Sequence, residues 1–159
     1  MLHPKVTEAL NQYGIDAEGM ECDPSFADTA AFLEKYGFTA DETCNAIVGI
    51  GKGEPPKYAC CVVLANSKVD INKRFSQLVG VKRCSFASGD QTLALTGMEI
   101  GGVTPVGLPE MPVYIDSQIM ACERIVLGGG NRTSKLLLNP AELKKIPHVQ
   151  IIEGLGIPR

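Results

Sequence analysis

The sequence predicts a single α+β domain in which helices flank a mixed β-sheet. Two neighbouring apolar runs, 46–50 and 58–65, are rich in Val and Ile and have the length of strands buried on both faces. Segments with helical spacing lie on both sides of these runs, without the strict alternation of strand and helix that builds a parallel sheet. The 159 residues contain no repeat or linker, so we treat 1–159 as one domain.

The N-terminal third predicts two helices. The first covers about 5–13, where apolar residues recur on one face. A polar stretch follows, for which no element is predicted. Ser25 then has the features of an N-cap, with an acid at the capping-box position, and the second helix ends at Gly37. Residues 39–42 repeat the cap signature and predict one short turn.

The remaining elements follow from apolar runs and cap residues. The segment GKGEPPK joins the two central strands as a hairpin. Asp70 caps a helix that ends at Gly80, and Ser88 opens a capping box for a helix to about Thr96. Asn139, followed by proline and glutamate, predicts another helix start. Further short strands are predicted at 83–86, 113–115, 124–127, 135–138 and 149–152.

Composition excludes several classes of protein. With 45% hydrophobic residues and a net charge of −3, the chain is not disordered. No apolar run approaches the ~20 residues of a membrane span, and the N-terminus lacks the apolar core of a signal peptide. We therefore expect a cytoplasmic protein with no membrane partner. The pI of 5.4 argues against a DNA-binding surface but permits a local basic patch.

The cysteines predict buried thiols rather than disulfides or a zinc site. No two of the six have C-x-x-C spacing, and as strand residues Cys60 and Cys61 would face opposite sides. The two histidines, His3 and His148, lie near opposite ends of the sequence, so no metal site is expected and no cofactor is implied.

Two catalytic motifs fail on inspection. The segment GIGKG, 49–53, resembles part of a phosphate-binding loop, but that motif would need a glycine at Ala46 and a hydroxyl residue at Gly53. No G-x-S-x-G elbow of a serine hydrolase is present.

The most informative stretch is 101–107, GGVTPVG. Its three glycines and one proline define an unusual backbone path that can present N–H and C=O groups to a ligand, although an ordinary tight turn is the alternative. A second glycine-rich segment, 128–132, follows an apolar run. Its Arg132 could pair with a phosphate or be a solvated loop residue.

These stretches resemble the YbaK/ProX-type prolyl-tRNA editing domains over residues 22–152. The order TGMEIGGVTPVGLPEMPVYID, a strand, GGGNR, a strand and NPAEL carries the resemblance. The most specific motif, G-G-x-[ST]-P-x-G, matches at Gly101, Gly102, Val103, Thr104, Pro105 and Gly107. Asp116, Gly128, Gly129 and Arg132 fit the pattern further downstream.

The resemblance implies a mixed, partly barrel-like sheet with flanking helices. It also implies hydrolysis, without a required metal, of the ester that joins a wrong amino acid to the 3′-terminal ribose of tRNA. The segment 101–105 would lie against the terminal adenosine and the aminoacyl group. The expected partners are the 3′ end of a mischarged tRNA and an aminoacyl-tRNA synthetase.

Three positions depart from the family pattern. Asn45 stands where many members have a functional lysine, Met20 where YbaK-like members have a tyrosine, and Lys135 where they have an aspartate. Asn45 can still form hydrogen bonds with a ribose or a carbonyl. Lys135 could return a positive charge to the same pocket, or it could be a solvated lysine on an edge strand.

The leading hypothesis is a trans-acting deacylase of a mischarged tRNA, with tRNA-Pro as one candidate. Its expected catalytic residues are Asn45, Gly101 and Gly102. The expected substrate-binding residues are Met20, Val103, Thr104, Pro105, Gly129, Arg132 and Lys135. Loss of the family lysine motivates two alternatives, a non-catalytic binder of aminoacyl-tRNA or a synthetase, and a deacylase of another small ester. The basic residues that could meet the tRNA backbone are Lys73, Arg74, Lys82, Arg83, Lys144 and Lys145.

Overall fold

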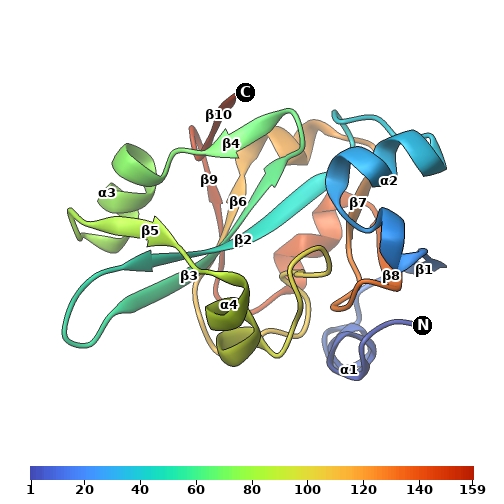
Figure 1. Cartoon of the computed structure of the whole chain (residues 1–159), viewed down its shortest axis with the longest axis horizontal. Coiled ribbons are helices and arrows are strands. Elements are labelled where there is room, and N and C mark those ends of the chain that lie inside the picture. The colour runs from blue at the N-terminus through green and yellow to red at the C-terminus, as the bar shows by residue number, and fades with distance from the viewer.

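The computed structural model describes residues 1–159 and contains three β-sheets with helices around them (Figure 1). The largest sheet consists, in spatial order, of β5 (Cys84–Phe86), β2 (Cys44–Gly51), β3 (Lys57–Leu64), β6 (Val113–Asp116) and β9 (Val149–Ile152). Strand β2 pairs antiparallel with both β5 and β3, whereas β6 pairs parallel with both β3 and β9. The predicted α+β class with a mixed sheet is confirmed.

Two smaller sheets complete the strand set. One has the order β1 (Glu18–Glu21), β8 (Ser134–Leu138), β7 (Ile125–Gly128), and the other pairs β10 (Gly156–Pro158) with β4 (Ser67–Val69). The α-helices are α1 (Pro4–Tyr13), α2 (Thr29–Tyr36), α3 (Ser76–Val79) and α4 (Gly89–Thr96). Four short helical turns are η1 (Pro24–Phe26), η2 (Ile71–Phe75), η3 (Ser117–Ala121) and η4 (Pro140–Lys145). None of the helices combines the length and apolar character needed to cross a membrane.

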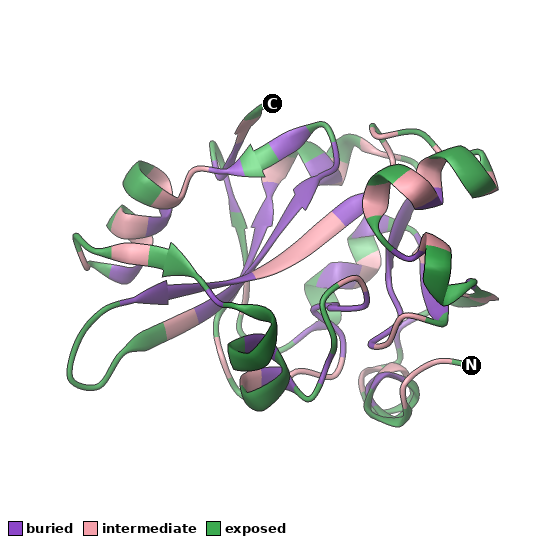
Figure 2. Ribbon diagram, in the orientation of Figure 1, coloured by how far each residue is buried: buried purple, intermediate pink, exposed green.

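The central hairpin is buried on both faces, as its apolar runs predict. Along β3, Cys60 and Val62 belong to one hydrophobic cluster, while Cys61 and Val63 belong to another on the opposite side. Figure 2 shows most of β3 as buried. The neighbouring cysteines therefore point in opposite directions, and all six cysteines are free.

Helix ends agree with the local signals except in one case. The capping box of α4 is present, since Ser88 Oγ accepts from the Gln91 amide (3.1 Å) and Gln91 Oε1 accepts from the Ser88 amide (2.9 Å). The expectation that Ser25 caps the second helix was wrong. Asp23 caps the separate turn η1, and α2 begins after Asp28, whose backbone is extended.

Three short strands, β1, β4 and β10, were not predicted. Each lies at the edge of a small sheet and pairs with a strand distant in the sequence. In β1, three of the four residues are exposed, so it lacks the alternating pattern of a half-buried strand. Pairing partners of this kind leave no local trace in the sequence.

The sheets do not close into a barrel, which corrects the barrel-like expectation. The larger sheet meets the β1–β8–β7 sheet through one isolated parallel bridge, between Thr43 and Val126. The edge of β2 from Cys44 to Val48 has no strand on the side away from β3, because β5 pairs only with Gly49–Gly51. Helix α2, β7 and part of segment 101–107 surround this open edge, and a cavity lies between them.

Candidate active site

A cavity of about 280 Å³ lies at the open edge of β2. Four residues predicted for the site line it together: Asn45, Gly101, Val103 and Lys135. They come from β2, from the segment 101–107, which we call the glycine loop, and from β8. The fold therefore brings together residues that are up to 90 positions apart in the sequence.

Asn45 presents a free donor to the cavity. The residue is half-buried in the unpaired stretch of β2, where Figure 2 shows intermediate burial. Its Oδ1 accepts a hydrogen bond from Thr29 Oγ1 at 2.6 Å, which fixes the orientation of the amide. The Nδ2 group makes no hydrogen bond within the protein, so it is available to a carbonyl or hydroxyl of a ligand.

Lys135 is a buried cation in the wall of the cavity. The residue is 8% exposed, and its Nζ donates to the carbonyl oxygens of Ala27 (3.0 Å) and Gly101 (2.9 Å). The ammonium also lies 5.1 Å from the ring centroid of Phe32, a cation–π contact. Burial lowers the pKa of Lys135 below its ordinary value. The alternative of a solvated edge lysine is therefore wrong.

The glycine loop presents unpaired N–H groups at Gly101 and Val103. Both residues line the cavity, and neither amide donates a hydrogen bond within the chain. Gly102 is different, because its amide donates to Glu99 O (2.9 Å) and its carbonyl accepts from the Gly130 amide (2.7 Å). A side chain at Gly102 would overlap the backbone of Asn131. Gly102 therefore lies outside the cavity lining and packs the loop against its neighbour.

Gly128 allows the loop to lie directly on β7. A Cβ at this position would be 2.6 Å from the carbonyl oxygen of Val103 and 2.7 Å from that of Gly102. No larger residue could occupy Gly128 without moving the loop. Gly128, from the glycine-rich segment 128–132, thus allows close packing of the glycine loop backbone.

Arg132 joins the glycine loop to the start of α2. Its Nη1 donates to Asp28 Oδ1 and to Ile100 O, both at 2.9 Å, and its Nη2 donates to Pro24 O at 3.0 Å. These bonds occupy both terminal nitrogens, so the geometry favours a positioning role over the expected contact with phosphate.

Asp28 adds a negative charge to the same cavity. Its side chain lines the cavity and is 71% exposed. The hydrogen bond from Arg132 lowers the pKa of this carboxyl group, so it is ionised at neutral pH. The sequence indicated only a helix-capping position here, so its part in the site was missed, as were Thr29 and Phe32. No local motif marks these residues, because only the tertiary fold brings α2 to β2.

Four other predicted residues do not line this cavity. Met20 lies on β1 opposite Lys135 in the strand register and packs beside the Phe32 cluster. Thr104 is fully buried, and its Oγ1 has no hydrogen-bond partner. Gly129 is buried, and its amide donates to Ser134 O at 3.2 Å. Pro105 lines a different cavity.

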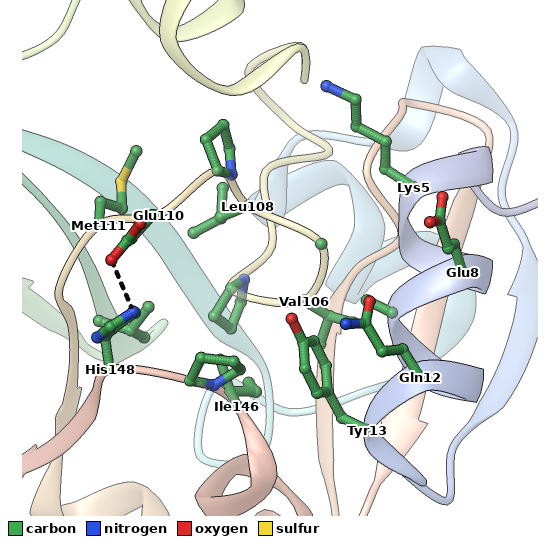
Figure 3. A pocket seen from close by; sticks show the side chains of 16 residues that line it. Lys5, Glu8, Gln12, Tyr13, Val106, Leu108, Glu110, Met111, Ile146 and His148 are labelled. Atoms are coloured by element: carbon green, nitrogen blue, oxygen red, sulfur yellow. Dashed lines mark ion pairs between the residues drawn. The ribbon is translucent and has the colours of Figure 1, made fainter.

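That second cavity is larger, about 590 Å³, and lies between α1, residues 105–111 and residues 146–148. Figure 3 shows Gln12 and Tyr13 extending into it from α1, and His148 and Glu110 beside each other on the opposite side, with Nε2 and Oε1 3.4 Å apart. Its polar side chains are mainly exposed and do not include a buried charge. The smaller cavity combines a buried cation, a free amide and free backbone donors, and is the better candidate for chemistry.

A cysteine nucleophile does not fit the smaller cavity. Cys44 lines it, but burial raises the pKa of this thiol far above neutrality. Burial likewise raises the pKa of Cys60 to about 12. Since the thiolate is the nucleophilic form, both groups are inert at neutral pH.

Comparisons with known proteins agree with this geometry. Residues 23–146 match the aminoacyl-tRNA editing domain family. YwhH of Bacillus subtilis (strain 168), an uncharacterized protein, is 29% identical over 137 residues, which cover 86% of this chain and 85% of YwhH. A proline–tRNA ligase of Shouchella clausii (strain KSM-K16) is 30% identical over 95 residues, which cover 60% of this chain but only 16% of the ligase.

Two crystal structures share the fold. A candidate trans-editing enzyme for prolyl-tRNA synthetase has a TM-score of 0.81 at 23% identity, with 96% of this chain and 98% of that chain covered. The hypothetical protein APE2540 has a TM-score of 0.85 at 21% identity, with 96% and 99% covered. The family match includes every residue that lines the smaller cavity. The chain therefore belongs to the aminoacyl-tRNA editing domain family.

Proposed function

We propose that the protein is a trans-acting deacylase that hydrolyses the ester of a mischarged tRNA in the cavity at the edge of β2. The observation that carries this proposal is that Asn45, Gly101 and Val103 line one cavity, while Asn45 Nδ2 and the backbone amides of Gly101 and Val103 form no hydrogen bond within the chain. Two free backbone amides suit an ester carbonyl whose oxygen gains negative charge during attack, and the side-chain amide of Asn45 suits a hydrogen bond to the neighbouring ribose or aminoacyl group.

In the proposed reaction, water attacks the carbonyl carbon of the ester. The amides of Gly101 and Val103 stabilise the resulting oxyanion, and Asn45 holds the ribose or the aminoacyl group. The C–O bond to the ribose then breaks, the ribose oxygen takes up the proton released by the water, and the amino acid leaves. Removal of one oxyanion-hole donor from a hydrolase costs roughly 3–4 kcal/mol of transition-state stabilisation.

The charged residues of the cavity have supporting roles in this scheme. The ammonium of Lys135 holds the carbonyl of Gly101 and so fixes the Gly101–Gly102 peptide group, which lies between the two peptide groups whose N–H groups are free. The ionised carboxylate of Asp28 lies where it can bind the α-ammonium of the aminoacyl group. Arg132 connects Asp28 to Ile100, the residue that precedes the glycine loop, through hydrogen bonds to Asp28 Oδ1 and Ile100 O.

A non-catalytic binder of aminoacyl-tRNA is the second candidate. It is favoured because both charged side chains of the cavity already have partners within the protein. Asp28 is paired with Arg132, and Lys135 donates to two carbonyls. Neither is a free general base, so the attacking water would depend on the substrate's own ribose hydroxyl for proton transfer.

A panel of mischarged tRNAs separates the two candidates. The panel begins with tRNA-Pro carrying non-cognate amino acids, because both the ligase relative and one structural neighbour concern prolyl-tRNA synthesis. A deacylase releases amino acid from at least one tRNA faster than spontaneous hydrolysis, with or without chelator. Binding to the panel without release would establish the binder.

A further inference from the structure

We propose that the β2–β5 edge of the large sheet is a track for tRNA, leading from the cavity over Phe86 to a basic cluster formed by Lys52, Lys82 and Arg83. The inference rests on the proposed function, because it assigns the surface that receives the acceptor strand of the same substrate. The track occupies the part of the sheet that extends away from α2 and β7 (Figure 1).

The cluster joins two segments that are distant in sequence. The Lys52 amide donates to Arg83 O at 2.9 Å, which ties the end of the β2–β3 hairpin to the residues that precede β5. All three side chains are exposed, and none forms a salt bridge or a side-chain hydrogen bond. Glu54 is the single acid in the hairpin loop. Unpaired cations gathered on a chain with net charge −3 form a local site for a polyanion.

Phe86 lies between the cluster and the cavity. It pairs with Gly49, so β5 ends where the open edge of β2 begins. Its side chain is 44% exposed, which is unusual for an aromatic residue on a strand. Gly49 and Asn45 lie on the same face of β2, and Phe86 shares that face because it stands directly opposite Gly49. The buried ring of Phe75 covers this face at Gly49, so the path follows the edge of the sheet rather than its face. An exposed ring on this path suits stacking of an unpaired base.

The length of β2 matches the anatomy of a tRNA end. Lys52 lies seven positions after Asn45, which corresponds to about 23 Å along the strand. Several unpaired nucleotides can span this distance. A terminal adenosine in the cavity would thus place unpaired nucleotides near Phe86 and the first phosphates of the paired acceptor stem near the basic cluster.

Other predicted cations are less suited to this role. Lys145 donates to Gly14 O (3.0 Å) and pairs with Glu142 (2.8 Å), and Arg74 donates to Glu153 O (2.9 Å). Their charges are partly engaged within the protein. Lys68 and Lys144, in contrast, are exposed and free but lie on β4 and η4, away from the β2–β5 edge, and so provide matched controls.

The test uses an RNA hairpin that carries no amino acid and has a four-nucleotide 3′ overhang ending in CCA. The double variant Lys52→Glu/Lys82→Glu is compared with Lys68→Glu/Lys144→Glu, which changes the charge by the same amount. We expect the first to bind about tenfold more weakly at low salt and to lower the slope of log affinity against log salt by about 2, and the second to match wild type.

Phe86→Ala tests the middle of the track. It should weaken binding of the overhang hairpin at least about fivefold and leave a blunt hairpin unaffected, because only the overhang offers an unpaired base. Equal RNA affinity of the two double variants would overturn the track. The hairpin carries no aminoacyl ester, so its binding does not depend on hydrolysis. Absence of deacylase activity would therefore reject the proposed function without changing the measured RNA affinities. Wild-type RNA affinity in Lys52→Glu/Lys82→Glu with intact turnover would reject the track alone.

Discussion

At the scale of single residues, two cavity residues stand where the resemblance predicts other side chains: an amide at position 45 in place of a lysine, and an ammonium at position 135 in place of an aspartate. The sequence suggested that the two changes could compensate each other, and the structure places both side chains on one cavity. The sequence could not reveal that Lys135 donates hydrogen bonds to two carbonyls, since Ala27 and Gly101 are distant from it in the chain. We therefore expect Lys135 to act through the loop rather than on the substrate.

Replacing Lys135 by methionine tests this positioning role. Lys135→Met removes the donor that holds Gly101 O and leaves two carbonyls unpaired, at a cost of about 1–3 kcal/mol each where they stay buried. We expect kcat for deacylation to fall at least tenfold with a smaller change in KM. The exposed Lys68→Met is the control. Full turnover in the Lys135 variant would show that the loop needs no anchor.

The same variant has a distinct pH signature in stability. Because burial lowers the pKa of Lys135 in the folded protein, the unfolded chain binds more protons between that pKa and the ordinary value of 10.5. The free energy of unfolding contributed by this group therefore rises as pH increases through this window. Urea denaturation of wild type should show the rise, and Lys135→Met should lack it. If the free energy of unfolding had the same pH dependence in both proteins, this would contradict a lowered pKa of Lys135.

Restoring the family lysine should not restore a family-like site. Asn45→Lys would place a second cation in the cavity that already holds Lys135, and like charges in a partly buried space disfavour each other. We expect turnover no higher than that of wild type. Asn45→Ala, which removes the free amide together with the acceptor of the Thr29 hydroxyl, should also lose activity. Faster deacylation by Asn45→Lys would show that Lys135 does not supply the cavity's positive charge.

At the scale of elements, the site depends on how closely the glycine loop lies on β7. Gly128→Ala introduces a Cβ that must push the carbonyls of Gly102 and Val103 outward, and so displaces the amides proposed to bind the oxyanion. We expect a loss of at least tenfold in kcat. Gly89→Ala is the matched control, because a Cβ there meets no atom within 4 Å. Equal activities of the two variants would show that catalysis does not depend on how closely the glycine loop lies on β7.

Elements with local signals could be predicted from the sequence. The β2–β3 hairpin follows from two apolar runs and its turn, and α4 follows from its capping box. The glycine loop was identified by motif, but its free donors are Gly101 and Val103 rather than Gly102. Strands β1, β4 and β10 could not be predicted, since each depends on a distant partner. Asp28 could not be predicted as a site residue for the same reason, because only the position of α2 and the ion pair with Arg132 place it at the cavity.

At the scale of the whole molecule, two cavities border one loop. Ile100, Gly101 and Val103 contribute to the smaller cavity and residues 105–111 to the larger one. The sheet remains open at β2, so the smaller cavity adjoins the edge along which we place the tRNA. The function proposed here requires that the aminoacyl-adenosine end enters the smaller cavity and not the larger one.

The most direct measurement is an NMR titration with a non-hydrolysable aminoacyl-adenosine in which an amide replaces the ester. The account predicts the largest shifts at the backbone amides of Gly101 and Val103 and at the side-chain amide of Asn45. Lys135→Met should weaken these shifts, and Lys68→Met should not. Shifts confined to Gln12, Tyr13 and His148 in the larger cavity, or no shifts at all, would contradict the central claim.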